Sequence, residues 1–98
     1  MDKHRAIDIL RANEANIRKL GVTSLYLFGS TVRGEARSDS DVDLFFDYNP
    51  AMPFTLFDLF DIQEFFTSLL AGHVDIMTRD SIHPLIRDRV IDSAERIF

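Results

Sequence analysis

The sequence predicts an α/β (α+β) domain in which a small sheet is flanked by helices. Segments with apolar residues at helical spacing alternate with short aliphatic and aromatic runs, and glycine or proline stands between them. The chain has 98 residues, enough for one hydrophobic core and too few for two domains. We therefore treat residues 1–98 as a single domain.

The first half of the chain predicts one helix followed by two strands. Apolar residues at helical spacing over 3–20 indicate an amphipathic helix, which Gly21 ends. Residues 24–28 are a short aromatic and aliphatic run that stops at Gly29, which is typical of a buried strand. Residues 41–46 begin with alternating polar and apolar side chains, so we expect a strand with unlike faces.

The second half predicts a helix, a strand and a final helix. Thr55 followed three residues later by Asp58 matches a capping box, so we expect a helix from there to Gly72. Residues 73–78 alternate again and predict a third strand. The last segment, 84–97, has proline in its first turn and apolar residues at helical spacing, which predicts a closing amphipathic helix.

Composition narrows the class of protein. The 16 acidic against 11 basic side chains give a net charge of −5, which disfavours a nucleic-acid-binding surface. Without cysteine, the chain has neither a disulfide framework nor a cysteine-ligated zinc site. Its N-terminus lacks the apolar stretch of a signal peptide, and no apolar run approaches the ~20 residues of a membrane helix. We expect a cytoplasmic domain with no direct contact to membrane or nucleic acid.

Two short motifs are candidates for chemistry. Gly29-Ser30 at a strand end suits a phosphate, because glycine lets the backbone approach closely and the serine hydroxyl adds a donor. Asp41 and Asp43 are two apart on a strand, so both carboxylates project from one face, and such oxygen ligands suit Mg²⁺. Taken singly, each has an ordinary alternative, namely an unliganded turn and an acidic pair facing solvent.

Asp75 is the third candidate. It lies within the apolar strand over 73–78, where we expect a buried carboxylate that needs a partner or a metal. If this strand lies beside the strand of Asp41 and Asp43, three carboxylates converge next to a phosphate cradle. That arrangement indicates two-metal phosphoryl or nucleotidyl transfer.

The combined motif resembles a known family. Gly29-Ser30, ten residues and then Asp41-x-Asp43 has the GSx10DxD form of the nucleotidyltransferase superfamily that includes DNA polymerase beta. The string GSTVRGEARSDSDVDLF is similar to the minimal nucleotidyltransferases, or MNT proteins, and Asp75 stands where that family places its third carboxylate. The resemblance implies the polymerase beta-like fold, with a small mixed sheet between its helices.

The resemblance also implies a role for each of these residues. By this resemblance, Gly29 and Ser30 would hold the triphosphate of a nucleotide. Asp41 and Asp43 bind two Mg²⁺ ions. Asp75 binds the metal on the attacking side and helps to deprotonate the acceptor hydroxyl.

By the same resemblance, MNT proteins pair with HEPN-domain RNase toxins as their antitoxins. This implies transfer of AMP from ATP to a tyrosine hydroxyl of such a toxin, with Arg33 supporting the active-site loop. Two alternatives stay open: nucleotidyl transfer to a small molecule such as an aminoglycoside, and a catalytically silent antitoxin that acts by binding alone. Larger relatives carry a domain that grips the acceptor, so we expect a homo- or hetero-oligomer to supply this part.

Phe57 and Phe60 are candidates for the partner surface. On a helix they fall opposite the apolar stripe and among acidic side chains, where polar residues are usual. Aromatic residues are enriched at interface hot spots. The alternative is that the loop over 49–53 packs on both rings and makes them part of the core.

Overall fold

The sheet of this protein is built from strands with one apolar and one mixed face. The computed structural model describes residues 2–29 and 42–98. Within these ranges the elements in chain order are α1 Lys3–Ala12, α2 Glu14–Lys19, β1 Val22–Phe28, β2 Val42–Tyr48, α3 Leu56–Leu70, β3 Val74–Thr78, a 3₁₀ turn Arg79–Ser81, α4 Pro84–Ser93 and β4 Glu95–Arg96.

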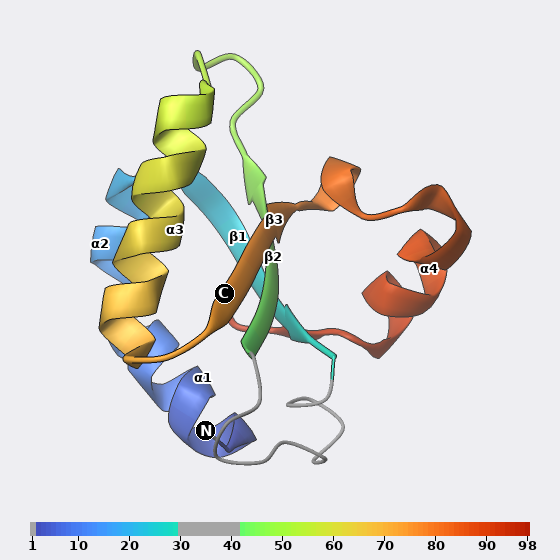
Figure 1. Ribbon diagram of the computed structural model, residues 1–98, viewed down its shortest axis with the longest axis horizontal. Coiled ribbons are helices and arrows are strands. Elements are labelled where there is room, and N and C mark those ends of the chain that lie inside the picture. Colours follow the sequence, from blue (N-terminus) through green and yellow to red (C-terminus); the bar gives the residue numbers. More distant parts are fainter. Residues whose placement is uncertain (1, 30–41) are drawn as a thin grey trace.

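The strands form one mixed sheet in the order β3-β2-β1-β4. β1 runs antiparallel to both β2 and β4, whereas β2 and β3 run parallel because α3 connects them as a crossover. Figure 1 shows α1, α2 and α3 on one side of the sheet and α4 on the other. The predicted mixed sheet flanked by helices is therefore confirmed.

The core lies between the sheet and the three helices on that side. On β2, Val42, Leu44 and Phe46 are buried in this core, whereas Asp43 and Asp47 alternate with them and point to the opposite face. This alternation is the reason why a strand with an apolar side can also carry the candidate site.

The helix expected over 3–20 is two helices, and this part of the prediction is wrong. α1 ends at Ala12 and α2 begins at Glu14, with Asn13 between them. The side-chain amide of Asn13 donates to the carbonyl of Ile9 over 2.8 Å. The side chain thus competes with a backbone N–H for an acceptor of the helix. The predicted end at Gly21 is confirmed, since that glycine has a φ of +101°.

α3 follows the prediction closely. Thr55 and Asp58 form the expected capping box. The helix ends at Leu70, two residues before the predicted glycine, and the C-cap residue Ala71 has a φ of 52°. From its middle, the amide of Gln63 donates to the carbonyl of Val74 over 2.6 Å, which satisfies a backbone acceptor of strand β3 at the margin of the sheet.

The closing helix is shorter than predicted. α4 ends at Ser93, and Glu95–Arg96 form the edge strand β4 beside β1. The backbone N–H of Ile97 donates to the carbonyl of Leu25 over 2.8 Å, and the Ile97 side chain is buried in the core. These residues form a strand at the sheet edge in place of a helix, because pairing with β1 satisfies their backbone groups and also buries the isoleucine. Among the described residues, no helix is long and apolar enough to cross a membrane.

Candidate active site

Gly29 and Asp43 form the centre of the candidate site. Gly29 follows the last residue of β1 and has a φ of +81°, a conformation that favours glycine. A β-carbon placed on it would lie 3.1 Å from Cγ of Asp43 and closer still to the carboxylate oxygen Oδ2. The Asp43 carboxylate therefore occupies the space that any larger residue at position 29 would need.

Asp75 lies beside Asp43 on the neighbouring strand. The two residues are register partners in the parallel pair of β2 and β3, with Val42 and Val74 as the preceding pair. Because Val42 and Val74 are buried on the helix side, both carboxylates project from the opposite face of the sheet. The structure thus brings together two of the three carboxylates that the sequence singled out.

The expectation that Asp75 is buried is wrong. Its side chain is exposed, whereas Asp43 is half-buried. β3 is an outer strand of the sheet, so solvent reaches Asp75 from the margin, while β2 has a strand on each side. The two carboxylates therefore differ in their access to water and to any incoming molecule.

Ser30, Arg33 and Asp41 lie outside the described residues, so their expected roles stay predictions. Within the part of the chain that the structure describes, no group of three or more histidine, aspartate or glutamate side chains could hold a metal ion. Asp43 and Asp75 supply two oxygen ligands of the kind that Mg²⁺ prefers. Asp41 is the residue from which we expect a third.

An ion pair that the sequence did not predict lies on the same face of the sheet. Arg79, directly after β3, donates from Nε to Oδ1 of Asp47 over 2.8 Å and from Nη2 to Oδ2 over 2.9 Å. Its guanidinium carbon lies 5.0 Å from the centre of the Tyr26 ring and 5.3 Å from that of Phe45. The hydrogen bonds that Arg79 donates to the Asp47 carboxylate raise the pKa of Arg79 above its ordinary value, so the guanidinium stays charged.

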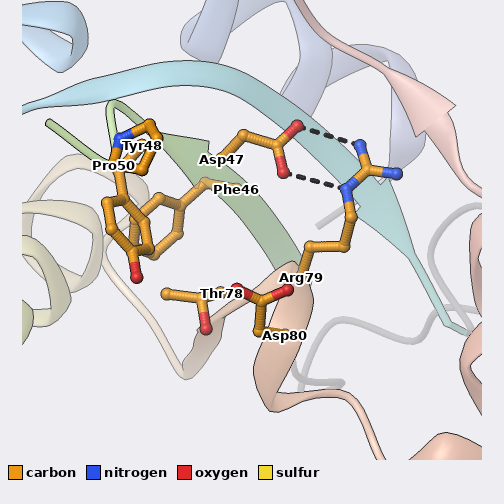
Figure 2. Close-up of a pocket in the computed structure, with 7 residues that line it drawn as sticks. All are labelled: Phe46, Asp47, Tyr48, Pro50, Thr78, Arg79 and Asp80. Carbon is orange, nitrogen blue, oxygen red and sulfur yellow. Dashed lines mark hydrogen bonds and ion pairs between the residues drawn. The ribbon is translucent and has the colours of Figure 1, made fainter.

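A small cavity of about 190 Å³ lies next to this ion pair. Figure 2 shows the side chains that line it: Phe46, Asp47, Tyr48, Pro50, Thr78, Arg79 and Asp80. It lies at the carboxyl end of β2, whereas Asp43 lies at the amino end, and four residues of strand span roughly 13 Å. The cavity is therefore separate from the Gly29–Asp43–Asp75 site.

Phe57 and Phe60 lie in the first two turns of α3. Their exposed fractions are 82% and 64%, so the alternative in which the 49–53 loop buries them is wrong. The apolar stripe expected on the opposite side of the helix is confirmed by the burial of Ile62 and Phe66. The exposure leaves both phenylalanines available for a partner, and their use for one stays a prediction.

Comparison with known proteins identifies the family. The model of the nucleotidyltransferase domain family matches residues 9–97. The chain belongs to this family. This nucleotidyltransferase is 36% identical over 84 residues to protein adenylyltransferase MntA of Thermococcus cleftensis, a match that covers 85% of this chain and 83% of that protein.

Solved structures agree with this assignment. One assigned as a minimal nucleotidyltransferase has a TM-score of 0.73 and 31% identity, and the match covers 97% of this chain and 95% of that one. Another contains a tri-AMPylated HEPN toxin of Shewanella oneidensis in complex with an MNT antitoxin. It has a TM-score of 0.59 and 20% identity over 90% of this chain and 71% of that one, and it shares the fold of this chain. The predicted minimal nucleotidyltransferase family is confirmed, and with it the enzyme class.

Proposed function

We propose that this nucleotidyltransferase transfers AMP from ATP to a tyrosine hydroxyl of a HEPN-type RNase toxin in the cytoplasm and so acts as its antitoxin. The observation that carries the proposal is the register pairing of Asp43 with Asp75, with the Asp43 carboxylate against Gly29. The name of the Thermococcus relative supports a protein acceptor, and the Shewanella complex supports AMP as the group and a HEPN toxin as the partner.

The side chains fit Mg²⁺, because Asp43 and Asp75 present hard oxygen ligands from one face of the sheet. We propose that Asp41, Asp43 and Asp75 together hold two ions. When bound, these ions would neutralise phosphate charge and favour deprotonation of the acceptor hydroxyl. Gly29 and Ser30 would bind the triphosphate, and Arg33 would support their loop.

The difference in exposure supports a division of roles. Asp43 is half-buried against Gly29, which suits a fixed ligand on the nucleotide side. Asp75 is exposed on the outer strand, which suits contact with an arriving acceptor. In the proposed reaction the acceptor oxygen bonds to the α-phosphorus of ATP as the bond to pyrophosphate breaks, and a carboxylate oxygen of Asp75 takes the hydroxyl proton.

The test uses this chain together with the HEPN-domain protein of an adjacent reading frame. The pair is incubated with Mg²⁺ and each labelled nucleoside triphosphate, and the modified residue is located by mass spectrometry. We expect AMP on a tyrosine of the HEPN protein with ATP, and no label with Asp43→Asn. The absence of label on that protein with all four nucleotides would overturn the proposal.

Toxicity assays separate the two alternatives. If Asp43→Asn still neutralises the HEPN protein, the chain acts by binding alone. If the wild-type chain consumes ATP only when a small hydroxylated molecule such as an aminoglycoside is added, the acceptor is that molecule. A requirement for both Asp43 and the acceptor tyrosine supports antitoxin action through AMP transfer.

A further inference from the structure

The start of α3 carries an exposed apolar surface, which we call the α3 entry surface and define as Met52, Leu56, Phe57 and Phe60. Besides the two phenylalanines, Leu56 is 82% and Met52 is 59% exposed. These four are among six exposed large hydrophobic residues of the part that the structure describes, and they fall within nine consecutive positions. Clustering of this kind distinguishes the surface from single exposed apolar residues, which are common.

None of these four side chains belongs to the hydrophobic core of the described residues. The opposite side of α3 supplies the buried Ile62, Phe66 and Leu70, and the capping box of Thr55 and Asp58 fixes the start of the helix. At the 150–250 Å² that an aromatic side chain offers, the two phenylalanines alone expose roughly 300 Å². That area is already comparable with the largest apolar patch on a typical monomer, and such patches are often functional.

Acidic side chains continue the surface along the helix. Asp61 and Glu64 are exposed and follow Phe57 and Phe60 at helical spacing, so they lie on one face. α3 has no lysine, arginine or histidine among its residues 56–70. A partner that complements this face must combine apolar side chains with lysine or arginine. A second copy of the chain carries the same excess of acid, with net charge −5, and is the poorer match.

The surface is remote from the candidate active site. α3 begins after the carboxyl end of β2, and Figure 1 shows its first turns at the end of the sheet away from the amino ends of β2 and β3, where Asp43 and Asp75 lie. The 15 residues of the helix span roughly 22 Å. A contact made here would hold a partner without covering the site of transfer.

We infer that the α3 entry surface docks the HEPN-type partner through an apolar patch rimmed by lysine or arginine, and that it raises the local concentration of the acceptor tyrosine. This inference rests on the proposed function for the identity of the partner. An interface of standard size buries about 800 Å² on each side, so the four apolar residues would form its centre and the carboxylates its rim.

The experiment measures binding and transfer separately, with the purified HEPN-domain protein as the probe. Phe57→Ser with Phe60→Ser is compared with the wild type and with Leu85→Ser, a control on α4 that is 89% exposed. We expect the double variant to raise the Kd about thirtyfold and the KM for the HEPN protein in parallel, with kcat unchanged. The control should stay within about twofold of the wild type, since surface substitutions away from a contact have small effects.

Two further variants keep the inference testable if the double variant unfolds. Leu56→Lys alters one exposed side chain, and Asp61→Lys reverses one charge of the rim. Each should weaken binding while the far-UV circular dichroism matches the wild type. An unchanged Kd in both would overturn the inference. So would sedimentation showing that the chain alone is a dimer which the double variant dissociates, because the surface would then bind a second copy.

The experiments distinguish a failure of the proposed docking surface from a failure of the proposed AMP transfer. Asp43→Asn should lose transfer and retain the wild-type Kd. Binding that depends on Phe57 and Phe60 without any AMP transfer would support the docking surface and overturn the proposed reaction. Transfer with an unaltered KM in the double variant would support the reaction and overturn the docking surface.

Discussion

The carboxylate of Asp43 lies against the α-carbon of Gly29, in the space where a β-carbon would stand. The two residues come from adjacent antiparallel strands, because Phe28, which precedes the glycine, is the register partner of Asp43. Backbone geometry and side-chain space therefore require glycine at the same position, since φ there is +81°. Gly29 and Asp43, which belong to two candidate motifs that are separate in the sequence, therefore form one contact in the fold.

Gly29→Ala should impair transfer more than it impairs folding. The added methyl group would displace the Asp43 carboxylate, and alanine at positive φ costs about 1–2 kcal/mol. We expect a loss of activity of at least about a hundredfold, with a cooperative thermal transition at lower temperature. Gly21→Ala is the control, because it also has a positive φ but nothing within 4 Å of the added carbon. Equal activity in the two variants would contradict the importance of this contact.

Asp43→Asn should abolish transfer and leave stability close to that of the wild type. The substitution keeps the size of the side chain and removes one of two like charges on neighbouring strands, an arrangement that destabilises a sheet by up to about 1 kcal/mol. We expect the melting temperature to be equal or higher. Calorimetric titration with Mg²⁺ and ATP should show weakened binding. Full activity at saturating Mg²⁺ would rule out a metal-binding role.

Asp75→Asn should reduce the rate of transfer more than the affinity for ATP. Asp75 is exposed, so its substitution should leave the fold unaffected, and its proposed role is on the acceptor side. Positioned proton transfer typically contributes 10²–10⁴-fold to a rate, so we expect a loss of about a hundredfold or more. A parallel loss of ATP affinity, measured by calorimetry, would instead show that Asp75 binds the nucleotide–metal complex.

Arg79→Lys should destabilise the protein by about 1 kcal/mol, because lysine keeps the charge but loses the paired hydrogen bonds to Asp47 and the stacking on Tyr26. The raised pKa of Arg79 fixes the sign of the pH dependence. Stability from a raised pKa is fully present below the unfolded value and is lost only as pH rises through the folded value. In thermal unfolding, the difference in stability between the wild type and Arg79→Lys should therefore stay the same from about pH 6 to about pH 9. The exposed Arg89, changed to lysine, is the control.

Ile97→Ala should cost about 3 kcal/mol in the free energy of unfolding, measured with urea, because the side chain is 4% exposed and belongs to the main core. Leu85→Ala on α4 should change stability by less than about 0.5 kcal/mol. Similar values for both would mean that β4 contributes little to the fold. The side chain of Arg11 donates to the Ile97 carbonyl over 3.1 Å, so Arg11→Ala should give a smaller loss in the same direction.

Local signals in the sequence predicted the elements that local interactions determine. The capping box at Thr55 and the glycine that ends β1 are read from a few neighbouring residues, and both are confirmed. The closing segment could not be read in this way. Its apolar spacing suits a helix, but Ile97 follows the edge of β1, which lies about seventy positions earlier in the chain. Whether the closing segment forms a helix or an edge strand depends on tertiary contacts, and the spacing of apolar residues in the sequence carries no information about these contacts.

The candidate site also combines features that the sequence predicted with features that depend on the tertiary fold. The sequence predicted that Asp75 would meet the Asp41-x-Asp43 pair only if their two strands lay side by side, and the register of β2 and β3 confirms this for Asp43. The exposure of Asp75 depends on the order of strands, which the sequence did not predict. The ion pair of Asp47 and Arg79 joins residues 32 positions apart, and only the parallel alignment of β2 and β3 brings them together. A signal for it was present, since Asp47 alternates with Asp43 and a basic residue directly follows β3.

The position of β3 at the margin of the sheet bears on how such an enzyme can change during evolution. Within the described sheet, β2 is held between two strands, whereas β3 is bonded to β2 alone. Substitutions along β3 can reshape the approach to Asp75 while the interior strand keeps Asp43 against Gly29. Under the proposed division of roles, new acceptors can therefore be recruited by substitutions in one peripheral strand, while the residues proposed to bind the nucleotide stay unchanged.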